Sequence, residues 1–169
     1  MTKDELTLHC CFIGICVLLA AMLCQVLFGC APPKTPTPGG LVVHYSPGEK
    51  RLSSEKAAEL DARYAAVLEC LPPESFCRSE PPNFSINGEC DWFLFRGVKL
   101  RGYRYLNGTR RIVLPGSLGA AAHEMVHHYT CLGDHPDKAV YKTTLLATCG
   151  DTIDAFFRRM YPPPKECPA

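Results

Sequence analysis

The sequence predicts a small α+β domain stabilised by disulfides, and three observations lead to this prediction. Residues 53–71 and 118–132 have the composition and spacing of helices, an Asn-Gly pair at 107–108 separates two short β-type segments, and six cysteines follow residue 30. The chain has 169 residues and a formal net charge of +1. This length suits one domain with a core, and the absence of a long basic run argues against a nucleic-acid partner.

The first thirty residues differ in composition from the rest. An apolar run, FIGICVLLAAMLCQVLF, fills residues 12–28 and is followed by Gly29 and Cys30, which is typical of an export signal. The stretch LFGC at 27–30 resembles the bacterial lipoprotein signal, in which the chain is cut before a cysteine that then carries lipid. The resemblance implies a signal peptide at 1–29 and a lipidated Cys30. Because Asp4 and Glu5 offset Lys3, and seventeen apolar residues can just span a bilayer, an uncleaved membrane anchor is the alternative.

Both alternatives tether the domain to a membrane of the cell envelope, where it faces the periplasm or the exterior. Residues 30–40 are rich in Pro, Thr and Gly and predict an extended tether, so the folded domain covers residues 41–169. An exported chain with an even number of cysteines suggests up to three disulfides with fifteen possible connectivities, and the most local pairing is Cys70 with Cys77. The six cysteines are Cys70, Cys77, Cys90, Cys131, Cys149 and Cys167.

The first half of the domain is expected to contain one strand, one helix and a long loop. LVVHYSP at 41–47 is a short apolar run that ends at Pro-Gly, which predicts a strand. Residues 53–71 begin with Ser53 and carry apolar residues at helical spacing, which predicts an amphipathic helix. Residues 72–90 are Pro-rich and predict a loop held by disulfides.

The second half is expected to form a small antiparallel sheet followed by helices. The segments 91–100, 100–106 and 109–115 are β-type, and Asn107-Gly108 is a strong hairpin signal between the last two. Ser117 is a candidate N-cap for a helix that ends at Gly133. Further helices are predicted over 137–149 and 151–161.

The most informative stretch is AAAHEMVHHYTCLGDHPDK at 120–138, which holds four of the six histidines. His123, Glu124 and His127 form the pattern H-E-x-x-H on a predicted helix. Residues i and i+4 lie on one helix face, so both imidazoles can bind one ion. Zinc suits imidazole nitrogen, and Glu124, one residue further round the helix, is placed to act as general base on a water at that ion. The alternative is that these histidines lie on a solvated helix face without a metal.

This motif resembles that of the zincin metallopeptidases, and the resemblance implies the general fold and activity of that class. In these enzymes the H-E-x-x-H helix lies beneath an edge strand that holds the substrate, and a residue beyond the helix completes the zinc site. In the metzincin branch that residue is a histidine six positions after the second motif histidine. Gly133 occupies that position here, and Thr130 replaces the glycine of that branch, so the metzincin pattern is not met.

The third zinc ligand therefore stays open among a few residues. His135 is favoured because the chain can turn back at Gly133 and recover most of the distance that the helix rises after His127, which would return His135 to the metal. The alternatives are Asp151 or Asp154 on the last helix, and then Asp134 or Asp137. Among the neighbours of the motif, His128 is expected at the surface or behind the site, Cys131 in a disulfide, and Tyr129 in the core; His44 is expected to be structural.

The sequence thus predicts a membrane-tethered zinc metallopeptidase that cleaves a peptide or protein substrate. The expected site has Glu124 as base with His123, His127 and His135 as ligands to Zn²⁺, and the strand 109–115 is expected to lie along the cleft and pair with an extended substrate. One alternative is a zinc-binding surface lipoprotein without catalysis, whose coordination positions are all filled, with Cys131, Asp134 or Asp137 as the extra ligand. Another is a metal-free binding module of the envelope.

Overall fold

The computed structural model describes residues 34–45, 49–87, 92–95, 98–100, 102–104, 111–132 and 144–163. These residues form a mixed α+β domain, as the sequence predicts. The leader at 1–29, Cys30 and the segment that contains His135 lie outside them. Within the described ranges, no helix is both long and apolar enough to cross a membrane.

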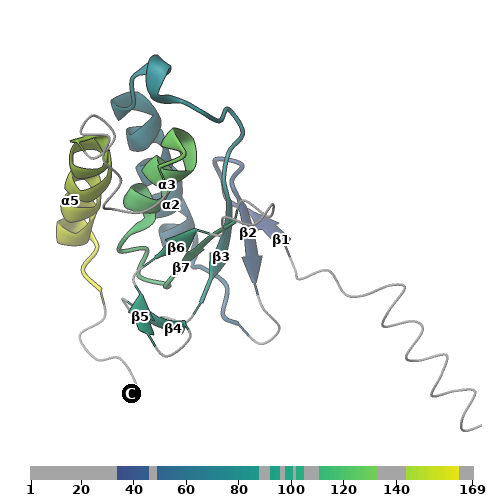
Figure 1. The fold of residues 1–169 in the computed structure, drawn as a ribbon. Helices are drawn as coiled ribbons and strands as arrows, with labels where there is room; N and C mark the ends of the chain where they lie inside the picture. Colours follow the sequence, from purple (N-terminus) through teal and green to yellow (C-terminus); the bar gives the residue numbers. More distant parts are fainter. Residues whose placement is uncertain are drawn as a thin grey trace, which may run out of the picture. The chain divides into compact units, whose positions relative to one another are not determined.

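The main sheet has five strands in the order β1-β2-β3-β7-β6 (Figure 1). Its strands are β1 (Lys34–Pro36), β2 (Val42–Tyr45), β3 (Asn83–Ile86), β6 (Tyr103–Arg104) and β7 (Arg111–Leu114). The pairs β2–β3 and β3–β7 are parallel, whereas β1 and β6 run antiparallel to their neighbours. The sheet is therefore mixed, and the prediction of an antiparallel sheet is confirmed for its outer pairs and wrong for its centre. A parallel pair requires a long crossover, and α2 (Ser54–Cys70) lies in the crossover from β2 to β3.

Strand β3 is not predicted by the sequence. It occupies the centre of the sheet within the segment predicted as loop, and its burial alternates, with Phe84 and Ile86 in the core. The strand has only two apolar residues. Two prolines directly precede it, and a glycine follows it closely. Its position between two neighbouring strands stabilises it by tertiary contacts rather than by local propensity.

The hairpin prediction is confirmed in its pairing. Strands β6 and β7 are antiparallel, with Tyr103 opposite Val113, although the Asn107-Gly108 turn itself lies outside the described residues. Strands β4 (Phe93–Phe95) and β5 (Val98–Leu100) form a separate two-stranded antiparallel sheet. Because β7 lies between β3 and β6, the strand 109–115 is not at an edge, and the prediction that it pairs with substrate is wrong. The terminal strand on this side of the described sheet is β6.

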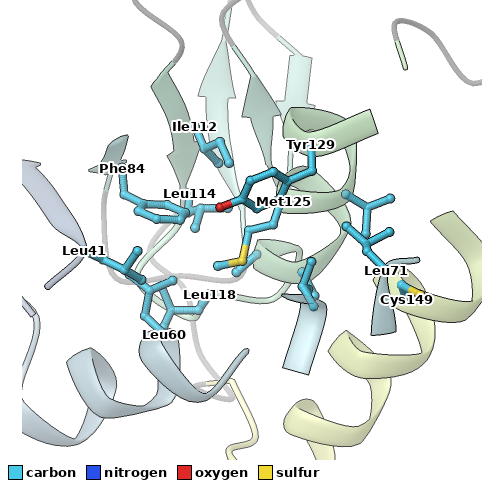
Figure 2. Close-up of a cluster of buried hydrophobic side chains, with 14 of the residues drawn as sticks. Leu41, Leu60, Leu71, Phe84, Ile112, Leu114, Leu118, Met125, Tyr129 and Cys149 are labelled. Atoms are coloured by element: carbon cyan, nitrogen blue, oxygen red, sulfur yellow. The ribbon is translucent and has the colours of Figure 1, made fainter. Parts of the chain in front are cut away.

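The core lies between the sheet and the helices α2 and α3 (Ala121–Thr130), as Figure 2 shows. Alternate residues of β2, β3 and β7 face it, among them Phe84, Ile112 and Leu114. Helix α2 confirms the predicted helix: Ser53 caps it by accepting a hydrogen bond from the Lys56 amide through Oγ at 3.2 Å. Burial of these apolar side chains is the main driving force that holds α3 against the sheet.

Helix α3 is shorter than predicted at both ends. It begins at Ala121 and not after Ser117, whose Oγ instead accepts a hydrogen bond from the Gly119 amide at 3.3 Å. Its own N-cap residue, Ala120, has no side-chain acceptor for the first amides. At the other end Cys131 takes a left-handed conformation with φ of 54°, so the helix stops before Gly133.

The last helical segment is continuous where two helices were predicted. A π-helical stretch, η2 (Leu146–Asp151), runs directly into α5 (Thr152–Met160), which confirms the predicted helix at 151–161. The predicted boundary at Cys149 is therefore wrong, and residues 137–143 of the earlier helix lie outside the described ones. π-helical turns are rare and often occur at functional sites.

Two disulfides link segments that are distant in the sequence. Cys70 at the end of α2 pairs with Cys149 in η2, and Cys77 pairs with Cys131 at the end of α3. The guess of a Cys70–Cys77 pair is wrong, whereas the prediction that Cys131 is in a disulfide is confirmed. Cys90 and Cys167 lie outside the described residues.

The Cys70–Cys149 disulfide is expected to contribute strongly to stability because its partners are 79 residues apart. Replacing both cysteines by serine should lower the free energy of unfolding by roughly 2–5 kcal/mol, since closing a long loop restricts the unfolded chain. Urea unfolding of the oxidised protein and the double variant measures the difference. A loss well below 1 kcal/mol would contradict this role.

Candidate metal centre

The two motif histidines face each other on α3. His123 and His127 lie one turn apart, and their Nε2 atoms are 3.1 Å apart. His127 is buried and only 5% exposed, while the His123 side chain is 14% exposed and borders a cleft. The helical register that the sequence predicts for the pair is therefore present.

Each ring has its other nitrogen beside a hydrogen-bond acceptor. His123 Nδ1 lies 2.7 Å from Oδ1 of Asp151, and His127 Nδ1 lies 3.0 Å from the carbonyl oxygen of Leu132. A carbonyl and a carboxylate can only accept, so both Nδ1 atoms act as donors. In the neutral form of each ring, Nε2 then carries a lone pair and no proton.

This arrangement fits a bound cation. Two lone pairs that face each other at 3.1 Å repel unless a positive charge lies between them. Two nitrogens bound to one tetrahedral zinc at 2.0–2.1 Å are about 3.3 Å apart, which is close to the observed separation. Metal-binding histidines usually have such an acceptor at the ring nitrogen that does not bind the metal, because it fixes the tautomer and the ring orientation.

The described residues contain no group of three or more His, Cys, Asp or Glu side chains placed to hold one ion. Asp151 lies at Nδ1 of His123, on the opposite side of the ring from Nε2. Asp154 binds backbone amides and an arginine. Three other ligand candidates, His135, Asp134 and Asp137, lie outside the described residues.

Glu124 borders the same cleft, and the chain that enters β6 approaches it closely. A Cβ atom at Gly102 would lie 2.7 Å from Cγ of Glu124, so only glycine allows this approach without a shift. Strand β6 follows Gly102 directly and contacts α3. The predicted base Glu124 is thus beside β6, the terminal strand of the described sheet. The sequence predicts the strand 109–115 along the cleft instead.

Gly150 allows η2 to pack close to α3, which places Asp151 beside His123. A Cβ atom at Gly150 would lie 3.0 Å from Cα of His123, which means that η2 packs directly on the backbone of α3. The π-helical turn ends at Asp151, and Thr152 Oγ1 donates to the carbonyl of Ala147 at 2.8 Å within it. The irregular turn and the close packing together place the carboxylate at the imidazole.

Asp154 caps the N-terminus of α3 from a neighbouring helix. Its Oδ1 accepts from the Ala122 amide and its Oδ2 from the His123 amide, both at 3.0 Å. These amides have no partner within their own helix, and a carboxylate at a helix N-terminus also interacts favourably with the helix dipole. Asp154 therefore fixes the start of α3 at the first motif histidine.

Asp154 is itself held by a buried charge network. Arg63 of α2 donates through Nη1 to Asp154, and through Nη2 to Oε1 of Glu59 at 2.6 Å, while Lys56 pairs with Oε2 of Glu59 at 2.7 Å. Burial raises the pKa of Asp154 to about 6, although Arg63 and the two backbone amides act in the opposite direction. The sequence does not predict this network. Its only signal there is that Glu59 and Arg63 interrupt the apolar face of α2.

His128, Tyr129 and His44 are all buried. His128 is buried, which excludes the surface and leaves the other expected position, behind the site; its Nε2 lies 2.9 Å from the Glu80 carbonyl oxygen, which ties α3 to the segment before β3. Tyr129 is in the core as predicted, where it donates to the Tyr64 hydroxyl at 3.0 Å, and burial raises its pKa. His44 is buried in β2, and desolvation, with Arg111 and Lys34 nearby, lowers its pKa.

A cleft of about 680 Å³ adjoins the histidine pair. It is bordered by the loop before α3, by α3 and by α5. The residues that line it are Gly102, Gly119, Ala120, His123, Glu124, Asp151, Asp154, Ala155, Arg158 and Arg159. The cleft is large enough to accept a short stretch of peptide.

Comparison with known proteins adds no family to this description. No family model, no curated protein and no solved structure matches the chain. The assignment of a function therefore depends on the geometry around His123 and His127.

Proposed function

We propose that this protein is a zinc-dependent metallopeptidase of the zincin type, tethered to the cell envelope by lipid at Cys30. The observation that carries the proposal is the paired histidines: their Nε2 atoms are 3.1 Å apart, and an acceptor lies at each Nδ1. Glu124 is the next residue along α3 and borders the same cleft. A base, two imidazole ligands and an adjoining cleft support hydrolysis rather than metal storage.

His123 and His127 would hold the zinc ion, and His135 is the proposed third protein ligand. Asp151 and Asp154 are less suited to that role, because one orients His123 and the other caps α3. A zinc ion bound there would act as a Lewis acid and lower the pKa of a water ligand to about 7.

The chain's own residues would then perform the proton transfers and hold the substrate. Glu124 accepts the proton of the attacking water and passes it to the leaving amine, which requires a carboxylate within hydrogen-bond reach of both. The terminal strand β6 offers backbone groups to which an extended peptide can add as a further strand. Asp151 and the Leu132 carbonyl keep the two imidazoles in the tautomer that leaves Nε2 available to the metal.

The direct test is hydrolysis of a mixed-sequence peptide library by the full-length protein, purified in mild detergent and supplied with zinc. Cleavage should occur, stop with a chelator and return when zinc is restored. Zinc binding without any cleavage would instead favour the non-catalytic zinc lipoprotein, whose coordination positions are all filled.

Asp151 is expected to tune metal affinity without binding the metal. Asp151→Ala should weaken zinc binding roughly 10–100-fold, because the His123 imidazole loses the partner that orients it. Asp151→Asn should recover part of this loss, since its side-chain carbonyl still accepts a hydrogen bond. Competition titration with a zinc chelator measures both affinities, with the exposed Glu55→Gln as a control of equal charge change. Unchanged affinity in Asp151→Ala would refute this role.

A further inference from the structure

The cleft beside the histidine pair is lined by both acidic and basic side chains. The carboxylates of Glu124 and Asp151 lie on its lining near the histidines, whereas Arg158 and Arg159 line it further along α5. From Asp151 to Arg158 the chain advances seven residues along η2 and α5, or about 10 Å at the 1.5 Å rise of a regular helix. The arginines therefore lie about two helical turns further along α5 than Asp151, the residue that contacts His123.

The two arginines differ in how firmly they are held. Arg158 is half-buried, and its Nε donates to the Gly119 carbonyl oxygen at 3.1 Å, which fixes the side chain against the loop before α3. Arg159 is exposed, and its Nε donates to the Ala155 carbonyl of its own helix at 3.4 Å. The cleft thus has two adjacent cationic side chains: Arg158 is bonded to the loop before α3, and Arg159 is bonded to its own helix.

Two acidic residues of the cleft already have partners away from Arg159. Asp154 is bound by Arg63 and by two amides of α3, and Asp151 lies at His123. Across the described ranges of the chain, no carboxylate forms an ion pair with Arg159. Its guanidinium offers donors with the geometry to bind a carboxylate.

The lining includes four residues with no side chain beyond Cβ. They are Gly102, Gly119, Ala120 and Ala155. Small residues leave room for the backbone and side chains of an extended peptide, which advances about 3.3 Å per residue. Three such residues cover the roughly 10 Å between the metal end and the arginines.

We infer that Arg158 and Arg159 make this cleft selective for substrates that carry a carboxylate about three residues from the scissile bond. The inference rests on the proposed peptidase function and deepens it by naming the substrate class. The carboxylate can belong to an Asp or Glu side chain or to the C-terminus of the substrate, and the chemistry of recognition is the same for both. Arg159 is the more informative residue to change because it is exposed and its loss does not remove the contact of Arg158 with Gly119.

The test uses full-length, zinc-loaded protein and matched peptides with amidated C-termini, in which the third residue on either side of the cleaved bond is Glu or Gln. One pair of peptides is varied on each side of the cleaved bond. In one of these two pairs, the Glu peptide should be cleaved with a kcat/KM roughly three- to tenfold higher than the Gln peptide, since one or two partly solvated ion pairs contribute modestly. A further pair, with a free or an amidated C-terminus at that position, distinguishes a terminal carboxylate from a side chain. Added salt should reduce the preference.

Variants then assign the preference to the arginines. Arg159→Gln and Arg158→Gln should each reduce it, and Arg159→Glu should favour a Lys peptide over the Glu peptide. Arg51→Gln removes an exposed arginine outside the cleft and should retain the preference. Equal cleavage of each matched pair, or a preference unchanged in both arginine variants, overturns the inference alone. Failure to cleave any library peptide overturns the proposed function and the inference with it.

Discussion

Glu124→Gln is expected to abolish peptide hydrolysis while zinc stays bound. Glutamine has nearly the same size but cannot take a proton, and loss of a general base typically lowers kcat by roughly 10²–10⁴-fold. Because Glu124 is not one of the proposed ligands, zinc content should remain at the level of the unmodified protein. Hydrolysis rate and bound zinc, measured on the same preparation, separate the catalytic role from the structural one.

The control for this variant is Glu55→Gln, an exposed residue in the first turn of α2. It carries the same change of charge and should keep full activity. If Glu124→Gln cleaves peptides as fast as the unmodified protein, Glu124 is not the base and the proposed mechanism is wrong. If the variant loses zinc as well as activity, Glu124 contributes to metal binding instead.

Arg63→Met is expected to destabilise the fold by roughly 3–5 kcal/mol, the usual consequence of removing one partner from a buried ion pair. Glu59 and Asp154 are 1% and 5% exposed, so both would keep buried charges with fewer partners. Methionine approximately retains the packing, which includes the contact of the Arg63 guanidinium with the Phe157 ring at 4.9 Å. Such a loss is a large part of the 5–15 kcal/mol that stabilises a typical domain.

Urea unfolding of Arg63→Met beside Arg51→Met measures this effect. Arg51 is exposed before α2, and its replacement should change the free energy of unfolding by less than about 0.5 kcal/mol. Because Asp154 caps α3 at His123, the Arg63 variant should also bind zinc more weakly under conditions where it remains folded. A stability equal to that of the control would show that the network contributes little to the fold.

The elements with strong local signals are those that could be predicted from the sequence. Helix α2, α5 and the β6–β7 pairing follow from an N-cap serine, helical spacing and an Asn-Gly turn. Strand β3 could not be predicted because its stability depends on β2 and β7, which are far away in the sequence. The two parallel pairs at the centre of the sheet both contain that strand, so they could not be predicted for the same reason.

The site could be predicted only in its local part. His123 and His127 lie on the same face of α3 because they are four residues apart, and this follows from the motif alone. The partners that orient or fix this helix come from elsewhere: Asp151 lies 28 residues away from His123, and Arg63 lies 91 residues away from Asp154. Such contacts between distant segments depend on how η2 and α5 pack on α3, which no local pattern specifies.

The most direct test of the account is the amount of zinc bound per chain in the full-length protein. Elemental analysis after dialysis against limiting zinc should find about one zinc ion per chain, and the ion should be lost in a His123→Ala/His127→Ala double variant. His44→Gln, which changes a histidine of β2 outside the motif, should retain it. Absence of zinc from the unmodified protein after reconstitution, or equal zinc in the double variant, would contradict a metal centre between His123 and His127.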